Sequence, residues 1–331
     1  MVNLRDVARD AGVSTSTASR VLDERLPRSG SAAADRVRKA AADLGYVRDP
    51  LASGLRRAGT STVGVIVPRL TDTVMAMMYE ELAAAAASRG LFAIVATTQD
   101  HPDAEHLAVQ SLLRRRVDGI VLTTARLNHA VPIETNGHHA TQILALRSDG
   151  IRPAAVGDDR LGGQLATRHL IDLGHTRIGL VGGPRYASSA LGRREGYAQA
   201  LADAGIAFDG SLVVGDSFSM EAGESAGHAL LSRPDRPTAI FADNDHTAIG
   251  VMATAHALGL RIPDDLSVVG YNDIPVVSRL PVPLTTVRVP FRQIAAGALD
   301  LLLDATTTDR PPRTLVYPPT LIPRKSTAKA S

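Results

Sequence analysis

The chain has 331 residues, of which 44% are hydrophobic and 21% charged, the composition of an ordinary folded protein that is too long for one small core. It contains no cysteine, which excludes disulfides and cysteine-ligated zinc. No apolar run reaches the roughly 18 residues of a membrane span, and the amino-terminal residues lack a signal-peptide core, so we expect a cytoplasmic protein that does not enter a membrane.

The net charge of +2 is unevenly distributed along the chain. Residues 1–60 hold 11 Lys and Arg against 7 Asp and Glu, and the rest holds 25 against 27. A basic amino-terminal segment suggests a polyanionic partner such as nucleic acid, although an excess of this size also arises by chance.

The first 22 residues predict two short helices. Residues 4–11 form the first, with Asn3 as its cap and Asp6 placed to complete a capping box. Gly12 permits a tight ending, and Ser14 caps a second helix over residues 15–22. This second helix has one apolar face, and its opposite face presents four polar side chains, Thr15, Ser16, Ser19 and Arg20.

Two short helices joined by a tight turn form a helix-turn-helix, in which the second helix enters the DNA major groove. The small hydroxyls of Thr15 and Ser16 allow close approach to DNA, and Arg20 can contact a guanine or a phosphate. An ordinary helical hairpin with a polar outer face has the same pattern, so the pattern alone leaves both interpretations open.

A third helix is predicted over residues 32–44, ended by Gly45. The segment 50–57 then has helical signals, Asp49 as a cap and Pro50 at the first position, but only about two turns. It should be helical only when something holds it, with Ala52 and Leu55 on one face.

These residues resemble the head of the LacI/GalR (lactose-repressor) family. The resemblance covers the whole head in order: Asp6-Val7-Ala8, Ala11-Gly12-Val13-Ser14, Ser19-Arg20-Val21-Leu22, Leu44-Gly45-Tyr46, Leu51-Ala52 and Leu55-Arg56. It implies that Thr15, Ser16 and Arg20 read the DNA. It also implies that Ala52 and Leu55 contact DNA from a hinge helix, with Leu55 in the minor groove. The loop before the third helix is one residue longer than is usual in the family, which leaves the cap of that helix uncertain.

From residue 62 onward, short apolar runs alternate with helical periods. Strands are predicted over residues 63–67, 91–96, 119–122, 142–146, 178–181, 239–242 and 266–269, and helices over 76–89, 106–116, 163–173, 189–204, 220–231 and 246–258. Alternation of this kind predicts parallel sheets covered on both faces. The strands are too many for one mononucleotide fold, so two α/β lobes are expected, with a ligand between them or at the carboxyl ends of the strands.

The same family resemblance continues through this body, in the motifs Arg177-Ile178-Gly179-Leu180-Val181, Phe241-Ala242-Asp243-Asn244-Asp245, Val269-Gly270-Tyr271-Asn272-Asp273 and Pro283-Leu284-Thr285-Thr286. It implies an α/β protein with an all-α helix-turn-helix head and a two-lobed body like a periplasmic binding protein. The domains implied are a head over 1–58, with its hinge helix at about 50–57, and a body over 60–331. Lobe 1 would comprise about 61–157 and 288–316, and lobe 2 about 160–285 and 319–326, with chain crossings near Asp158, Thr286 and Tyr317.

By resemblance, Arg193, Asn244, Asn272 and Phe291 match cleft residues that hold a sugar or another small ligand. Their chemistry agrees, because Arg and Asn offer hydrogen bonds to hydroxyls and an aromatic face packs on a sugar ring. Asn244 could instead be only a helix cap, and Phe291 could belong to the core.

Two departures from the family concern the expected wall of the pocket. The family often has an aromatic pair after the first strand, where this chain has Asp72-Thr73-Val74-Met75, and an Asp where this chain has Leu146-Arg147. Together these changes remove a carboxylate and a stacking face and add a cation. A ligand with an acid or phosphate group would suit Arg147 and Arg193, unless Arg147 is simply solvated.

The prediction is therefore a repressor that binds a pseudo-palindromic operator as a homodimer, with a carbohydrate or related metabolite, including an anionic one, as effector. An enzyme is the first rival, but the chain has no nucleotide-binding, zinc-protease or nucleophile-elbow motif. No catalytic residue, metal site or cofactor is expected. An exported solute-binding protein, the second rival, would not carry a helix-turn-helix.

Overall fold

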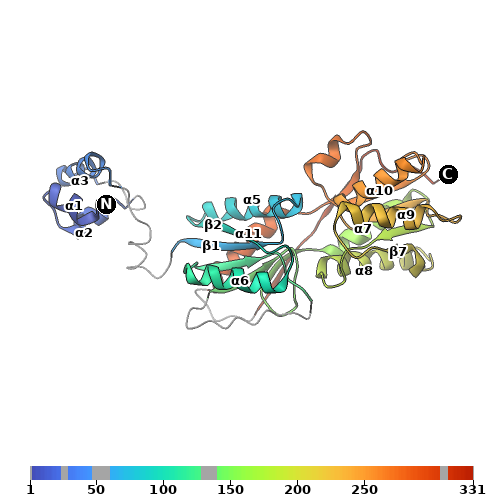
Figure 1. Cartoon of the computed structure of the whole chain (residues 1–331), viewed down its shortest axis with the longest axis horizontal. Helices are drawn as coiled ribbons and strands as arrows, with labels where there is room; N and C mark the ends of the chain where they lie inside the picture. The colour runs from blue at the N-terminus through green and yellow to red at the C-terminus, as the bar shows by residue number, and fades with distance from the viewer. Residues whose placement is uncertain (1, 24–28, 47–59, 128–139, 306–311, 331) are drawn as a thin grey trace. The chain divides into compact units, whose positions relative to one another are not determined.

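The computed structural model describes residues 2–23, 29–46, 60–127, 140–305 and 312–330. It divides into two compact units, Met1–Thr60 and Ser61–Ser331, which are called the head and the body below (Figure 1). The predicted hinge segment 50–57 lies outside the described residues. Among the helices in the described ranges, none is long and apolar enough to cross a membrane.

The described part of the head contains three helices, α1 (Leu4–Asp10), α2 (Thr15–Val21) and α3 (Ala32–Asp43). Asn3 and Asp6 form the predicted capping box of α1, and the Ser14 side chain accepts from the backbone N–H of Thr17 at the start of α2. The cap of α3 is Ser31, whose Oγ accepts from the N–H of Ala34. Each helix thus begins at a side chain that satisfies one of its free N–H groups.

The three helices enclose one small core. Its fully buried members include Val7 on α1, Ala18 on α2 and Val37 on α3. A hydrogen bond also joins α3 to the end of α1, because the Arg36 Nε donates to the carbonyl oxygen of Ala11 at 3.2 Å. Because small residues fill this core, α1 and α2 pack closely, which fixes the angle at which α2 presents its outer face.

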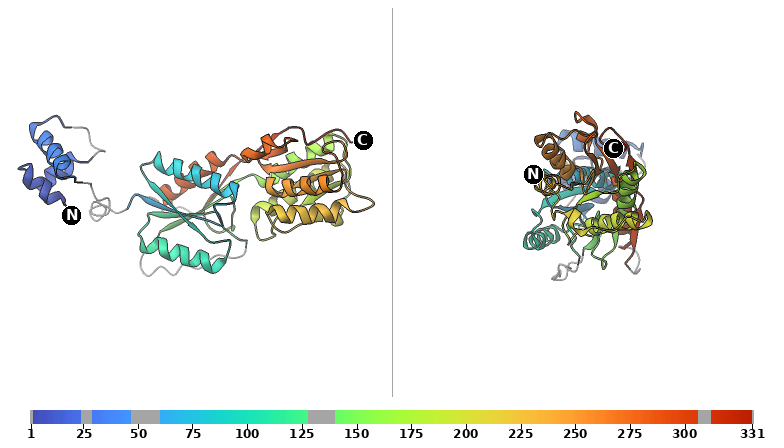
Figure 2. Two further views of the ribbon diagram at one scale, coloured as in Figure 1. Left: turned by 45° about the horizontal axis from the view of Figure 1, so that its top comes forward. Right: turned by 90° about the vertical axis from the view of Figure 1, so that its right-hand side faces the viewer.

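The first sheet of the body has six strands among the described residues. In spatial order they are β11 (Thr314–Tyr317), β5 (Ala154–Gly157), β4 (Thr141–Ala145), β3 (Gly119–Leu122), β1 (Thr62–Val67) and β2 (Phe92–Thr97), all paired in parallel. Helices α5 (Thr73–Ala87) and α11 (Phe291–Ala305) cover one face and α6 (Pro102–Arg114) the other, as Figure 2 shows. This sheet and its helices form lobe 1.

Side chains along β1 point alternately to the two faces of the sheet and pack against the helices on each face. Val65 belongs to the same core cluster as Leu82 of α5, and Ile66 belongs to the cluster of Val109 on α6. A strand that is buried on both faces needs a continuous apolar run, and this accounts for the sequence pattern at residues 63–67.

The second sheet also has six described strands and, with its helices, forms lobe 2. Their order is β12 (Thr320–Ile322), β10 (Thr285–Arg288), β9 (Ser267–Asn272), β8 (Ala239–Ala242), β6 (Ile178–Val181) and β7 (Val213–Val214), with only β12 antiparallel. The helices are α7 (Asp159–Asp172), α8 (Ser188–Asp203), α9 (Met220–Leu231) and α10 (Asp245–Ala257).

Two neighbouring residues of β9 show how these helices are layered. The Tyr271 hydroxyl reaches Gly162 on α7, whereas Gly270 faces Ala248 on α10. Adjacent strand residues point to opposite faces, so α7 with its partner α8 covers one face and α10 with its partner α9 covers the other. All four helices can be followed in Figure 1.

The chain passes between the two lobes three times. β5 ends at Gly157 before α7 begins at Asp159, β10 ends at Arg288 before α11 begins at Phe291, and β11 ends at Tyr317 before β12 begins at Thr320. The first and third passages are tied together, because the Asp158 N–H donates to the carbonyl oxygen of Tyr317 at 2.8 Å. Three adjacent connections permit hinge motion of one lobe against the other.

Candidate ligand cavity and DNA-binding face

The outer face of α2 carries the predicted DNA-reading residues. Ser16 and Arg20 are exposed, and Thr15 and Ser19 are partly exposed. Within the described part of the chain the Arg20 side chain makes no hydrogen bond or ion pair, so its guanidinium is available to a partner. Ala52 and Leu55, the other two residues assigned to DNA, lie outside the described residues.

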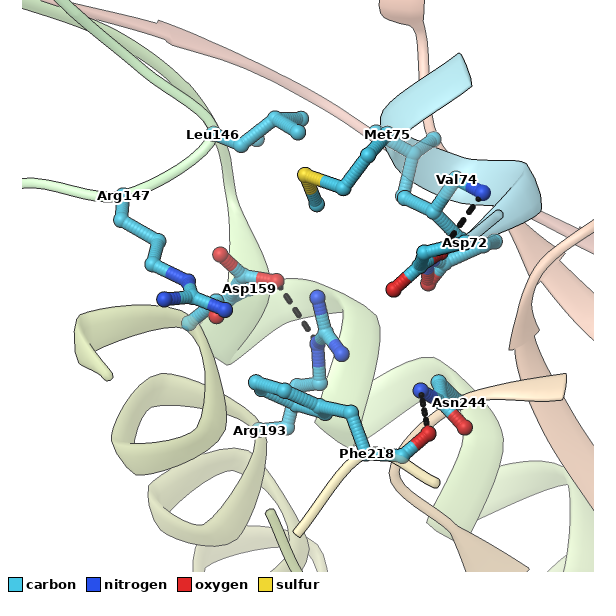
Figure 3. Close-up of a pocket in the computed structure, with 13 residues that line it drawn as sticks. Asp72, Val74, Met75, Leu146, Arg147, Asp159, Arg193, Phe218 and Asn244 are labelled. Atoms are coloured by element: carbon cyan, nitrogen blue, oxygen red, sulfur yellow. Dashed lines mark hydrogen bonds and ion pairs between the residues drawn. The ribbon is translucent and has the colours of Figure 1, made fainter. Parts of the chain in front are cut away.

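A cavity that opens to solvent lies between the two lobes of the body (Figure 3), and its empty space, including the part that is open to solvent, amounts to about 520 Å³. Most of its lining comes from the carboxyl ends of strands and the amino ends of helices: Asp72, Val74, Met75, Leu146, Arg147, Gly157 and Val289 from lobe 1 and its connections, and Asp159, Ser189, Arg193, Phe218, Asn244 and Asn272 from lobe 2. Ligands of open parallel sheets characteristically bind at this edge.

Five of the six residues assigned to the ligand from sequence line this cavity: Asp72, Arg147, Arg193, Asn244 and Asn272. Phe291 is not among the lining residues. It is the first residue of α11, is 6% exposed, and packs in the core of the body, which is the alternative that the sequence left open. The apolar face of α11 lies against the first sheet, and this draws Phe291 away from the cavity.

Phe218 supplies the aromatic face that Phe291 does not. Sequence reasoning missed Phe218, which stands in a polar loop between β7 and the Ser219 cap of α9. The signal was present, since a large aromatic residue in the polar stretch 215–219 has no helix or strand face to explain it. A carboxylate that the sequence did not assign to the ligand also lines the cavity, that of Asp159 at the start of α7.

Arg193 is held from several sides on the floor of the cavity (Figure 3). Its Nε donates to Asp159 Oδ1 at 2.8 Å and its Nη1 donates to the carbonyl oxygen of Asp243 at 2.6 Å. The guanidinium also lies over the Tyr271 ring, 3.8 Å from its centroid. Burial alone would lower the pKa of Arg193, but the carboxylates of Asp159 and Asp243 hold it above its usual value.

Asn244 caps α10 and lines the cavity at the same time. Its Oδ1 accepts from the Thr247 N–H at 2.7 Å, and its Nδ2 donates to the Phe218 carbonyl oxygen at 2.9 Å. The side chain therefore fixes the loop that carries Phe218, and one of its two amide hydrogens remains for a ligand.

Asn272 combines a positive φ angle with a side-chain oxygen that has no hydrogen-bond partner among the described residues. Its φ is +107° and that of Asp273 is +60°, values that non-glycine residues adopt at a cost and that concentrate at functional sites. Its Oδ1 is buried without a hydrogen-bond partner among the described residues. An unpaired buried acceptor at a cavity wall is suited to a ligand hydroxyl.

Direct contacts join the lobes beside the cavity. The Tyr186 hydroxyl of lobe 2 donates to Asp100 Oδ2 of lobe 1 at 2.5 Å, and Arg126 lies over the Tyr186 ring at 3.8 Å. The Ser148 N–H donates to Ser188 Oγ at 2.8 Å. These contacts hold the lobes together on the side of the cavity that carries Arg147.

The buried carboxyl group of Asp245, next to the cavity residue Asn244, should make the stability of the protein depend on pH. It is fully buried, and its carboxylate accepts from the Thr286 hydroxyl at 2.6 Å and the Ile274 N–H at 2.8 Å. Burial raises its pKa to about 7, against the effect of those two hydrogen bonds. Since the folded pKa lies above the unfolded one, the native state binds this proton more tightly, and its contribution to stability is lost as pH rises toward 7.

We therefore expect the stability of the unmodified chain, relative to Asp245→Asn, to fall by on the order of 2 kcal/mol between pH 5 and pH 7.5. Urea denaturation of both proteins across this range measures it. His169 and His175, whose pKa values burial lowers, give the opposite slope in both proteins and cancel in the difference. A difference that is independent of pH would contradict the prediction.

The described residues include no group of three or more His, Asp or Glu side chains arranged to hold a metal ion. Together, the helix-turn-helix head and the two-lobed body with a polar cavity at its strand ends define a DNA-binding protein with a small-molecule site.

Comparison with known proteins places this chain in a family. Residues 3–49 match the model of the bacterial regulatory proteins of the lacI family, and residues 167–327 match a periplasmic binding protein-like domain. The ribose operon repressor of Escherichia coli K12 is 33% identical over 312 residues, which cover 93% of this chain and 94% of the repressor. The chain belongs to the LacI family.

Solved structures agree with this assignment. A lac repressor dimer bound to operator and the anti-inducer ONPF is 28% identical, with a TM-score of 0.87 over 99% of both chains. The CelR–cellobiose complex is also 28% identical, with a TM-score of 0.76 over 98% of this chain and 100% of the other. Members of the family are ligand-responsive, DNA-binding transcription regulators, and this protein is a regulator of that kind rather than an enzyme.

Proposed function

We propose that this regulator is a repressor that binds a pseudo-palindromic operator as a dimer and that a polyhydroxylated small molecule in the interlobe cavity sets its affinity for DNA. The observation that carries the proposal is the cavity itself. It lies between two lobes joined by three chain passages, and its wall presents polar atoms, Asn272 Oδ1 among them, that lack partners among the described residues. The relatives named above, a ribose operon repressor and a cellobiose-bound regulator, support a carbohydrate as the ligand.

In this proposal the DNA residues keep the roles predicted from sequence. Thr15, Ser16, Ser19 and Arg20 face the major groove, and Ala52 and Leu55 face the minor groove at the operator centre. The ligand residues are Asp72, Arg147, Arg193, Asn244 and Asn272, with Phe218 as the aromatic face in place of Phe291.

The coupling between ligand and DNA follows from the two-lobed body. A ligand that touches both lobes binds the closed arrangement more tightly than an open one, and it can change DNA affinity only through that difference. Asp72 and Arg147 belong to lobe 1, whereas Phe218 and Asn272 belong to lobe 2, so a ligand that touches all four favours closure.

Replacing Arg20 by Ala tests the DNA face. If Arg20 pairs with a guanine, Arg20→Ala weakens binding to the operator by ~1–3 kcal/mol, because a bidentate contact to a base edge is lost. Fluorescence anisotropy with an operator selected from random duplexes measures the change, and a scrambled duplex of the same length is the control.

A base-reading role predicts a large loss on the operator and a small loss on the scrambled duplex. An equal loss on both would show that Arg20 contacts phosphate only, and no loss on either would remove it from the interface. Failure of the unmodified full-length protein to select any duplex would count against the proposed function as a whole.

A further inference from the structure

The two arginines of the cavity differ in how their charges are compensated. Arg193 has two carboxylates beside it: Asp159 at 2.8 Å and the Asp243 Oδ2 at 3.6 Å from its Nη1. It therefore has no unmet charge to offer a ligand. The sequence suggested that both arginines would suit an anionic ligand. In the structure only Arg147 remains a candidate for that role.

Arg147 is 4% exposed and lines the cavity, yet its Nη1 is buried without a hydrogen-bond partner among the described residues. Its ion-pair partner there is Asp100, whose Oδ1 is 3.8 Å away. Asp100 is shared, since it accepts from Tyr186 and lies 3.6 Å from Arg126. Two cations thus face one carboxylate, and the Arg147 charge also acts on the carboxylate of Asp243. Arg147 nevertheless makes no hydrogen bond to either, so its buried Nη1 remains for an anionic partner.

The electrostatics agree with this geometry. Burial lowers the pKa of Arg147 below its usual value although Asp100 opposes the shift, whereas the pKa of Arg193 is raised. A buried guanidinium whose charged form is disfavoured gains from an anion that makes charge-assisted hydrogen bonds to it.

The rest of the wall defines the remainder of the ligand. The ring of Phe218 lies 5.2 Å from the Arg147 guanidinium and offers an apolar face beside it. Asp72 lies on the opposite side of the cavity in Figure 3, and its carboxylate and the unpaired Asn272 Oδ1 can accept from hydroxyls. The cavity therefore has a cationic end and an accepting end.

We propose that the ligand is a polyhydroxylated molecule with one acidic group, a sugar acid or a sugar phosphate, and that Arg147 binds the acidic group. A neutral sugar would leave the buried Arg147 Nη1 without a charged partner, whereas a carboxylate or phosphate supplies one. The inference rests on the proposed function only in taking this cavity as the effector site.

The first experiment needs no ligand. Because Arg147 is buried and its Nη1 has no hydrogen-bond partner among the described residues, Arg147→Met should raise the Tm of the full-length protein by roughly 2–4 °C. Arg193→Met should lower the Tm, because it leaves Asp159 and Asp243 uncompensated. Arg185→Met, which removes an exposed charge from the loop before α8, should leave it unchanged. If Arg147→Met lowers the Tm as much as Arg193→Met, Arg147 is a structural ion-pair residue and the inference is wrong.

The second experiment screens matched compounds by thermal shift: D-galactose with D-galacturonate, D-glucose with D-gluconate and D-glucose 6-phosphate, and D-ribose with D-ribonate and D-ribose 5-phosphate. We expect an acidic member, and not its neutral counterpart, to raise the Tm. The carboxylate and phosphate arms separate the two kinds of acid. Arg147→Met should then weaken binding of that compound on the order of 100-fold, with Arg185→Met close to the unmodified chain.

Binding of a neutral member with equal or higher affinity than its acidic counterparts, undiminished by Arg147→Met, overturns the inference. If that neutral sugar also changes the affinity for the operator, the proposed function stands, and only the claim that the ligand carries an acidic group is wrong. For a panel in which no member binds, the ligand-free comparison of Arg147→Met with Arg193→Met decides the inference.

Discussion

Arg193→Ala is expected to destabilise the body by about 3–5 kcal/mol, because it leaves two buried carboxylates without their cation. The side chains of Asp159 and Asp243 are only 11% and 1% exposed. Burial already raises the pKa of both, that of Asp243 to about 6, with Arg193 in place. Removal of the guanidinium takes away the attraction that opposes this shift.

The midpoint of urea denaturation measures the effect, and Arg194→Ala is the matched control, the next residue of α8 and one that is only half buried. A second signature comes from pH. Without Arg193, both carboxyls take up protons more readily. The loss in free energy of unfolding caused by Arg193→Ala should therefore be smaller at pH 5 than at pH 8. A midpoint equal to that of Arg194→Ala would show that Arg193 does not stabilise the fold.

A ligand role for Arg193 must therefore be tested with a variant that stays folded. A variant that loses the ligand response through unfolding says nothing about contact with the ligand. Only a stably folded variant at operator-binding temperature, such as Arg193→Lys, separates the two roles, because Lys retains the charge and loses the fork geometry that serves Asp159 and the Asp243 carbonyl together.

Gly196→Ala is expected to have the second largest effect. A Cβ on Gly196 would lie 2.1 Å from the Arg160 carbonyl oxygen and 2.7 Å from the Gln164 N, both backbone atoms of α7. The reciprocal contact is equally close, since a Cβ on Gly163 would lie 2.2 Å from the Arg193 carbonyl oxygen. Helices α7 and α8 must separate to admit the methyl group.

Overpacking of this kind costs roughly 1–3 kcal/mol, more than the helix propensity of up to ~1 kcal/mol that Ala gains over Gly. The same displacement moves Arg193 of α8 away from Asp159 of α7, so ligand affinity should fall with stability. Denaturation midpoints of Gly196→Ala and of Glu195→Ala, the exposed neighbour on α8, test this. Equal midpoints for the two variants would mean that the interhelical contact is easily relaxed.

Local signals in the sequence determined most of the head and the framework of the body. Asn3 and Ser14 act on N–H groups two or three residues away, and a helix period or an apolar run such as Val63 to Val67 is complete within its own segment. Such features depend on neighbours in sequence, and this is why the three head helices and the long helices of the body could be predicted.

The short strands and the cavity depended on tertiary structure. β5, β10, β11 and β12 have three or four residues each and were not predicted. They are held in the sheets by pairing with segments that are distant in sequence. α11 was not predicted as a helix, and its packing against the first sheet buries Phe291.

The same reason explains the partners of the charged residues. Arg193 meets Asp159 and Asp243, which are 34 and 50 positions away in sequence, and the Asp100 that Arg147 faces is shared with Arg126 and Tyr186 from other loops. The sequence identified both arginines as cavity cations. Only the folded chain decided that Arg193 is hydrogen-bonded by its neighbours and that the Arg147 Nη1 is buried without a partner among the described residues, because burial and hydrogen bonding depend on side chains brought together from distant elements.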